Sequence, residues 1–150
     1  MQLSVESADA MRSLGERVAG ALRAGDLVVL SGPLGAGKTT LAQGIGRGLG
    51  VSGRVVSPTF VIARVHAGRV PMIHVDAYRL GSVAEVDDLD LDASLAESVT
   101  LVEWGEGLVE GLSGDLLRIW IDRPEDAGQE ARSVRLEGVG ARWAGVDPMS

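Results

Sequence analysis

The hydrophobic and polar positions of this chain follow two periods, which predict strands that alternate with helices. Apolar residues recur at helical spacing over residues 8–23 and 39–49. Residues 82–97 are predicted to form one or two short helices. Short apolar runs rich in β-branched residues predict strands. These runs are residues 3–5, 26–31, 61–65, 70–75, 99–102, 116–121 and 133–136.

The order of these elements indicates the fold class. Strands alternate with helices through the centre of the chain, whereas residues 62–75 and 116–136 are interpreted as hairpins. This pattern favours an α/β fold, namely a three-layer domain whose mixed, mostly parallel central sheet is flanked by helices. A length of 150 residues suits one domain. We place that domain at residues 1–137 and expect a flexible C-terminal tail at 138–150, which is rich in glycine and polar residues.

A glycine-rich loop joins the predicted strand at 26–31 to the predicted helix at 39–49. Residues 32–39 read Gly-Pro-Leu-Gly-Ala-Gly-Lys-Thr, the complete G-x-x-x-x-G-K-[ST] pattern of a phosphate-binding loop. In such a loop the backbone N–H groups of residues 35–39 face the phosphates, helped by the helix N-terminus. The lysine, here Lys38, reaches the β- and γ-phosphates, and the Thr39 hydroxyl is a Mg²⁺ ligand. The motif in this context predicts a P-loop NTPase-like domain.

Lys38 is the single lysine of the chain, since the other thirteen basic residues are arginine. A compact ammonium on a flexible stem reaches over the loop to the phosphates, whereas a guanidinium is bulkier and prefers bidentate partners. Lysine at this position therefore indicates a chemical constraint.

Two acidic residues, Asp76 and Glu103, follow apolar strands directly. Such acids lie beside the phosphate loop, where they can bind Mg²⁺ directly, bind it through water, or orient the attacking water. The alternative is that each caps a neighbouring helix. We favour Glu103 on the metal and Asp76 as the group that acts through water.

Two further segments are candidates for the site. Residues 57–60, Ser-Pro-Thr-Phe, carry two hydroxyls on a proline-restricted turn. This suits a loop that senses the γ-phosphate, although it also suits an ordinary turn before a strand. His74 stands two residues before Asp76, and we expect a buried neutral histidine with a backbone partner rather than a catalytic base. Arg79 is interpreted either as a group that neutralises transferred charge or as a salt-bridge partner of the acidic segment.

Charge and composition exclude several function classes. The net charge is −7, and residues 80–117 hold ten acidic and no basic side chains. That segment would repel nucleic acid. It suits docking on a basic protein partner, although a solvated acidic surface is the simpler interpretation. The absence of cysteine excludes disulfides and thiolate chemistry. No apolar run approaches the ~20 residues of a membrane span, so we expect a cytoplasmic protein without membrane contact.

Four blocks in this order resemble a known family. They are the phosphate loop at 32–40, Ser-Pro-Thr-Phe at 57–60, His-Val-Asp-Ala-Tyr-Arg-Leu at 74–80 and Leu-Val-Glu-Trp-Gly-Glu at 101–106. Together they resemble the bacterial tRNA threonylcarbamoyladenosine biosynthesis ATPase family, TsaE (also called YjeE), over roughly residues 5–136. The resemblance implies a small accessory ATPase with ATP and Mg²⁺ as cofactors, weakly active alone and stimulated on the TsaB–TsaD heterodimer. Contact with tRNA would be indirect or through that complex.

The resemblance also implies roles for residues at the matching positions. The catalytic set is Lys38, Asp76, Glu103 and Thr59. The metal set is Thr39, Glu103 and Asp76. The nucleotide-binding set is Gly35, Ala36, Gly37, Lys38, Thr39, Thr40 and Trp104.

Two other functions stay open at the level of sequence. A small-molecule P-loop kinase usually has an arginine-bearing lid, and residues 80–117 contain no basic residue for one. A nucleotide-binding partner protein with negligible turnover would use the same phosphate loop. A GTPase is disfavoured because the chain has neither an N-K-x-D motif nor a D-x-x-G motif.

Overall fold

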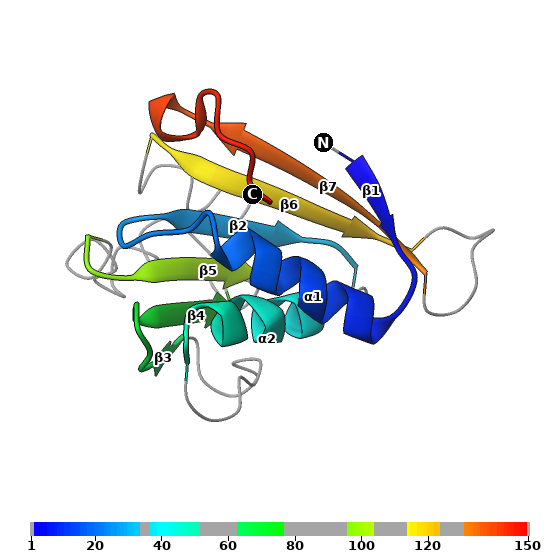
Figure 1. Ribbon diagram of the computed structural model, residues 1–150, viewed down its shortest axis with the longest axis horizontal. Helices are drawn as coiled ribbons and strands as arrows, with labels where there is room; N and C mark the ends of the chain where they lie inside the picture. Colours follow the sequence, from blue (N-terminus) through cyan, green and yellow to red (C-terminus); the bar gives the residue numbers. More distant parts are fainter. Residues whose placement is uncertain are drawn as a thin grey trace.

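The computed structural model describes residues 2–33, 37–51, 63–76, 96–103, 114–123 and 131–149. Within these ranges seven strands and two α-helices follow one another along the chain (Figure 1). Their order is β1 (Gln2–Val5), α1 (Ala8–Ala19), β2 (Leu27–Ser31), α2 (Lys38–Gly48), β3 (Ala63–His66), β4 (Met72–Asp76), β5 (Val99–Glu103), β6 (Leu116–Asp122) and β7 (Arg132–Val139). No helix in the described ranges is long and apolar enough to cross a membrane.

All seven strands form one mixed sheet in the order β1-β7-β6-β2-β5-β4-β3. The four central strands run parallel, because β2 pairs in parallel with both β5 and β6, and β4 pairs in parallel with β5. The edges are antiparallel: β3 pairs with β4, and β7 pairs with β6 and β1. The sheet confirms the predicted α/β class, and it confirms both predicted hairpins.

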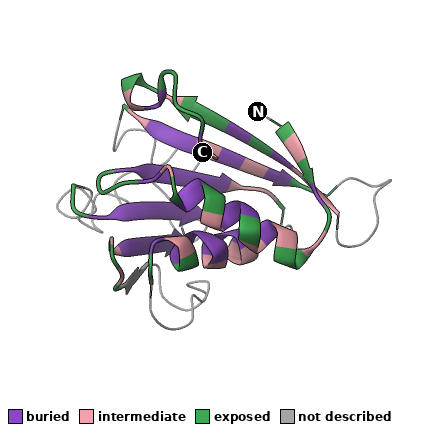
Figure 2. Ribbon diagram, in the orientation of Figure 1, coloured by how far each residue is buried: buried purple, intermediate pink, exposed green. Residues whose placement is uncertain are grey.

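The central strands of the sheet are buried on both faces, as a three-layer fold requires. Helices α1 and α2 lie side by side over one face, where they share a core with Val28, Leu30 and Leu101 (Figure 1). Residues at alternating positions of a strand point to opposite faces. Val29 and Val102, which alternate with those core residues, are buried as well. Figure 2 shows the central strands buried along most of their length. A parallel sheet covered on both faces explains why the central strands read as continuous apolar runs.

Helix α1 begins with a side-chain cap and ends earlier than predicted. The Ser7 hydroxyl accepts a hydrogen bond from the Ala10 N–H at 3.1 Å, which is the usual N-cap contact. The prediction continued the helix to residue 23, but it ends at Ala19. Beyond it the N–H groups of Ala21 and Leu22 donate to carbonyls three residues back, so the chain tightens into turns. Leu22 is nevertheless buried, which is why its spacing looked helical.

The two helices approach closely because glycines face the contact. A Cβ built on Gly15 of α1 would lie 2.6 Å from the Leu41 carbonyl oxygen of α2. A Cβ on Gly44 of α2 would overlap the Arg12 carbonyl oxygen of α1 in the same way. Small residues at a helix contact let the two backbones approach each other. The contact with α1 therefore sets the position of α2, whose first turn carries Lys38 and Thr39.

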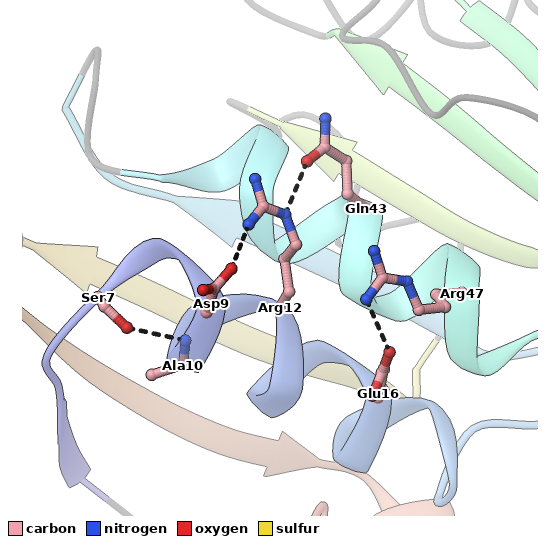
Figure 3. A network of polar contacts seen from close by, with 7 residues as sticks. All are labelled: Ser7, Asp9, Ala10, Arg12, Glu16, Gln43 and Arg47. Atoms are coloured by element: carbon pink, nitrogen blue, oxygen red, sulfur yellow. Dashed lines mark hydrogen bonds and ion pairs between the residues drawn. The ribbon is translucent and has the colours of Figure 1, made fainter.

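Polar contacts bridge the outer side of the same helix pair (Figure 3). Arg12 of α1 donates to Gln43 of α2 at 3.4 Å, and Arg47 of α2 pairs with Glu16 of α1 at 3.3 Å. Arg12 also pairs with Asp9 within α1. These pairs are solvent-exposed or half-exposed, so they contribute little beyond the apolar contact.

The C-terminal residues correct the expectation of a flexible tail from residue 138. Gly138 and Val139 continue β7, and a one-turn 3₁₀ helix follows at Ala141–Trp143. Trp143 is 5% exposed, and it packs against Gly138, where a Cβ would overlap its side chain. This packing could not be predicted from the sequence, because a single tryptophan among glycines forms no periodic pattern.

Candidate functional site

The N-terminus of α2 differs from that of α1. The N-cap of α2 is Gly37, which provides no side-chain cap and has a φ of 112°, where glycine carries no steric penalty. The first turn of α2 has no acidic residue. Helix α1 has both a Ser7 cap and Asp9 in its first turn. The positive end of the α2 dipole therefore has neither an N-cap side chain nor an acidic residue in its own first turn, and such an end suits an anion.

Lys38 lies inside the turn between β2 and α2. Its Nζ donates to the carbonyl oxygens of Gly32 at 2.6 Å and Pro33 at 3.1 Å. The residue is 6% exposed. Burying an ammonium is costly unless it is hydrogen-bonded, and the two carbonyls offset that cost. A positive charge is thus fixed at the carboxyl end of β2, beside the start of α2.

The sheet register brings the two predicted acidic residues to the same level. Asp76 and Glu103 are the last residues of β4 and β5, and they are directly paired. Glu103 is also paired with Leu30 of β2, two residues before Gly32. The ends of three adjacent parallel strands thus meet where β2 enters the loop, the usual ligand edge of an open α/β sheet. Glu103 is buried, at 4% exposure.

His74 contacts one of these acids. The His74 Nε2 and the Glu103 Oε2 lie 2.8 Å apart, and the two side chains are 0% and 5% exposed. The prediction of a buried histidine is confirmed. The expected backbone partner is wrong for Nε2, which meets a carboxylate on the neighbouring strand. The sequence could not reveal this contact, because it depends on the register between β4 and β5.

The oxygen donors at this edge fit Mg²⁺ held together with a phosphate. Among the described residues no group of three or more His, Cys, Asp or Glu side chains could hold a metal by itself. Mg²⁺ does not need such a group, because it takes one or two carboxylates and completes its shell with phosphate oxygens and water. The carboxylate of Glu103 and the hydroxyl of Thr39, in the first turn of α2, are donors of this kind.

Comparison with known proteins matches this fold and motif set to one family. The family model for the threonylcarbamoyl adenosine biosynthesis protein TsaE matches residues 5–134. The tRNA threonylcarbamoyladenosine biosynthesis protein TsaE of Streptomyces coelicolor is 61% identical over 142 residues, which cover 91% of this chain and 96% of the relative. The chain belongs to the TsaE family.

The TsaE likeness extends to more distant relatives. TsaE of Bacillus subtilis is 37% identical over 134 residues, covering 88% of this chain and 82% of that protein. The crystal structure of Bacillus subtilis YdiB is similar with a TM-score of 0.78 at 29% identity, covering 97% of this chain and 90% of that one. The resemblance first carried by four short blocks is thereby confirmed over most of the chain.

Several site residues of this TsaE-family chain lie outside the described residues. They are Gly35, Ala36, Thr59 and Trp104, together with Arg79, residues 57–60 and residues 80–95 and 104–113 of the acidic segment. Asp76 is described through its backbone and strand register. Thr40 lies in the first turn of α2 and is partly buried. The roles assigned to these residues stay predictions.

Proposed function

We propose that this TsaE-family chain is a small P-loop ATPase, which binds ATP with Mg²⁺ and hydrolyses it as an accessory subunit in tRNA threonylcarbamoyladenosine formation. The observation that carries the proposal lies at the carboxyl end of β2. There the buried Lys38 ammonium, the uncapped start of α2 and the Glu103 carboxylate converge. The names of the relatives support the tRNA pathway.

Each residue has a role in this proposal. The backbone N–H groups of residues 35–39 and the Lys38 ammonium bind the phosphates of ATP. Thr39 and Glu103 hold Mg²⁺, which neutralises negative charge on the phosphate oxygens. Asp76 completes the acid pair and orients the water that attacks the γ-phosphate.

Two predicted residues complete the site by family resemblance. Thr59 supplies a hydroxyl that senses the γ-phosphate, and Trp104 borders the nucleotide. Substitution of Thr59 or Trp104 should therefore alter nucleotide turnover or affinity.

The partner in this proposal is the TsaB–TsaD heterodimer. The resemblance implies that the heterodimer carries out the transfer to tRNA and that the ATP cycle resets the assembly between turnovers. The chain itself then reaches tRNA indirectly, in agreement with its net charge of −7.

The deciding experiment measures ATP binding and ATP hydrolysis by the purified chain, alone and with the TsaB–TsaD heterodimer of the same organism. We expect clear binding, slow hydrolysis alone and faster hydrolysis with the heterodimer. The Lys38→Ala variant, purified and measured in the same way, gives the background rate of contaminating ATPases. Binding without turnover in either condition would instead identify a nucleotide-binding partner protein. Absence of ATP binding would reject the phosphate site itself.

A further inference from the structure

The contact between His74 and Glu103 lies at the site and has no role in the mechanism proposed above. The two residues belong to adjacent parallel strands but are not directly paired, since His74 is paired with Leu101 and Glu103 with Asp76. His74 is therefore one two-residue step nearer the amino end of the sheet, about 6.6 Å along the strand. Its ring spans that step and meets the Glu103 carboxylate at 2.8 Å.

The chemistry of the two groups determines which of them donates the hydrogen bond. A carboxylate that binds a metal ion is ionised and only accepts hydrogen bonds, so in the proposed site Nε2 of His74 would be the donor. A hydrogen bond to Oε2 restricts the rotation of the carboxylate and with it the direction of the second oxygen, Oε1. The side chains of both residues are almost fully excluded from solvent, which makes a bond to an ionised group stronger and its loss more costly.

The pair is polar where the preceding positions on the same face of the sheet are apolar. The residues that precede the two along the same face of β4 and β5, Met72 and Leu101, are apolar and join the core beneath α1 and α2. The polar pair appears at the strand ends, where β5 lies beside β2 and the phosphate loop. Carboxylates that bind metals are commonly oriented by hydrogen bonds from residues that do not touch the metal.

We infer that His74 is a positioning residue, which orients the Glu103 carboxylate toward the Mg²⁺ that accompanies ATP. This inference rests on the proposed ATP–Mg²⁺ site. His74 itself does not touch the metal or the nucleotide, so it acts on the affinity for Mg²⁺ rather than on the affinity for the phosphates.

The test compares two amides that differ in reach. In His74→Gln the side-chain amide nitrogen falls near the position of Nε2 and can still donate to Glu103. In His74→Asn the same amide is one methylene shorter and falls short. For each full-length variant, the affinity for a fluorescent ATP analogue is measured in EDTA and in Mg²⁺, and Mn²⁺ bound with ATP is followed by electron paramagnetic resonance. Thermal unfolding shows whether each variant is folded.

We expect all three proteins to bind the nucleotide equally in EDTA. The increase in affinity on adding Mg²⁺ should fall about tenfold or more in His74→Asn, and the affinity for Mn²⁺ should fall with it. His74→Gln should retain most of the gain in nucleotide affinity with Mg²⁺ and most of the affinity for Mn²⁺. If His74→Asn does not fold, His74→Gln decides alone, and loss of its Mg²⁺ response would contradict the inference.

Other outcomes separate this inference from the proposed function. An undiminished Mg²⁺ response in His74→Asn would reject the positioning role and leave the ATP site standing. Equal losses of affinity in EDTA and in Mg²⁺ would show that His74 supports the loop structurally, which also rejects the inference. A wild-type chain that binds no ATP under either condition would reject both proposals.

Discussion

Asp26 and Arg142, which are 116 residues apart in the sequence, form an ion pair with two hydrogen bonds. The Nε and one terminal nitrogen of Arg142 donate to the two carboxylate oxygens of Asp26, both at 2.9 Å. The same terminal nitrogen donates to the Ala21 carbonyl at 2.7 Å. Asp26 immediately precedes β2, whose other end carries the phosphate loop. The C-terminal segment therefore fixes the strand that positions the proposed site.

Arg142→Ala should destabilise the fold strongly. The two side chains are 12% and 4% exposed, so the substitution leaves a buried carboxylate without its charged partner. Loss of one partner of a buried pair costs about 3–5 kcal/mol. Urea unfolding followed by circular dichroism measures this free energy. Arg47→Ala, which breaks an exposed pair with Glu16, is the control and should cost less than about 1 kcal/mol. Similar losses in the two variants would argue against a structural role for the Asp26 contact.

Lys38→Ala should lower the affinity for ATP at least tenfold, which corresponds to about 1.4 kcal/mol. The substitution removes the one ammonium in the turn between β2 and α2. Titration with a fluorescent ATP analogue measures the affinity. Arg47→Ala removes a positive charge from the last turn of the same helix and should bind normally. Unchanged affinity in Lys38→Ala would exclude this loop as the phosphate site.

Glu103→Ala should remove Mg²⁺-dependent ATP hydrolysis while nucleotide binding in EDTA persists. The carboxylate is buried at the carboxyl end of β5, beside β2, where it is the favoured metal ligand. Hydrolysis measured with and without Mg²⁺ gives the comparison, and Asp76→Ala is measured in parallel. If Glu103→Ala keeps wild-type turnover and Asp76→Ala loses it, the metal role belongs to Asp76.

Gly44→Ala should destabilise the chain although alanine is the better helix former. The intrinsic preference for alanine is about 1 kcal/mol. A Cβ at this position, however, overlaps the Arg12 backbone and forces α1 and α2 apart. Overpacking of this kind costs about 1–3 kcal/mol. Thermal unfolding should show a lower midpoint. Gly114→Ala, where a Cβ meets no atom of the described residues within 4 Å, should leave the midpoint unchanged. A midpoint that rises in Gly44→Ala would mean that the helices adjust freely.

The fold followed from the sequence wherever a local pattern determined an element. The buried strand that ends at Glu103 and the helix after the phosphate loop were both predicted to within one or two residues, because apolar periodicity and glycine boundaries mark them. The position of the acids at strand ends followed from the same pattern. Their alignment with Leu30 matches the expected ligand edge of a parallel sheet.

Contacts between distant segments were beyond the reach of the sequence. The pairing of Arg142 with Asp26 and the packing of Trp143 on Gly138 leave no periodic signal, so the C-terminal residues looked like a loose tail. The contact of His74 with Glu103 depends on a register that only the assembled sheet defines. The end of α1 was missed because Leu22 stays in the core after the helix has stopped.

The strand order has a consequence for how the chain is made. The loop at residues 32–39 leaves the ribosome early, but its parent strand β2 pairs with strands that begin at Val99 and Leu116. Leu27 can pair with Thr100, and Val28 with Leu117, only after β5 and β6 have been synthesised. Until then both edges of β2 are uncovered. Such long-range pairings slow folding relative to helical domains of the same size. A nascent or truncated chain that stops before β5 would carry the whole phosphate loop on a strand with two open edges, which is a surface for chaperones or for aggregation rather than for nucleotide.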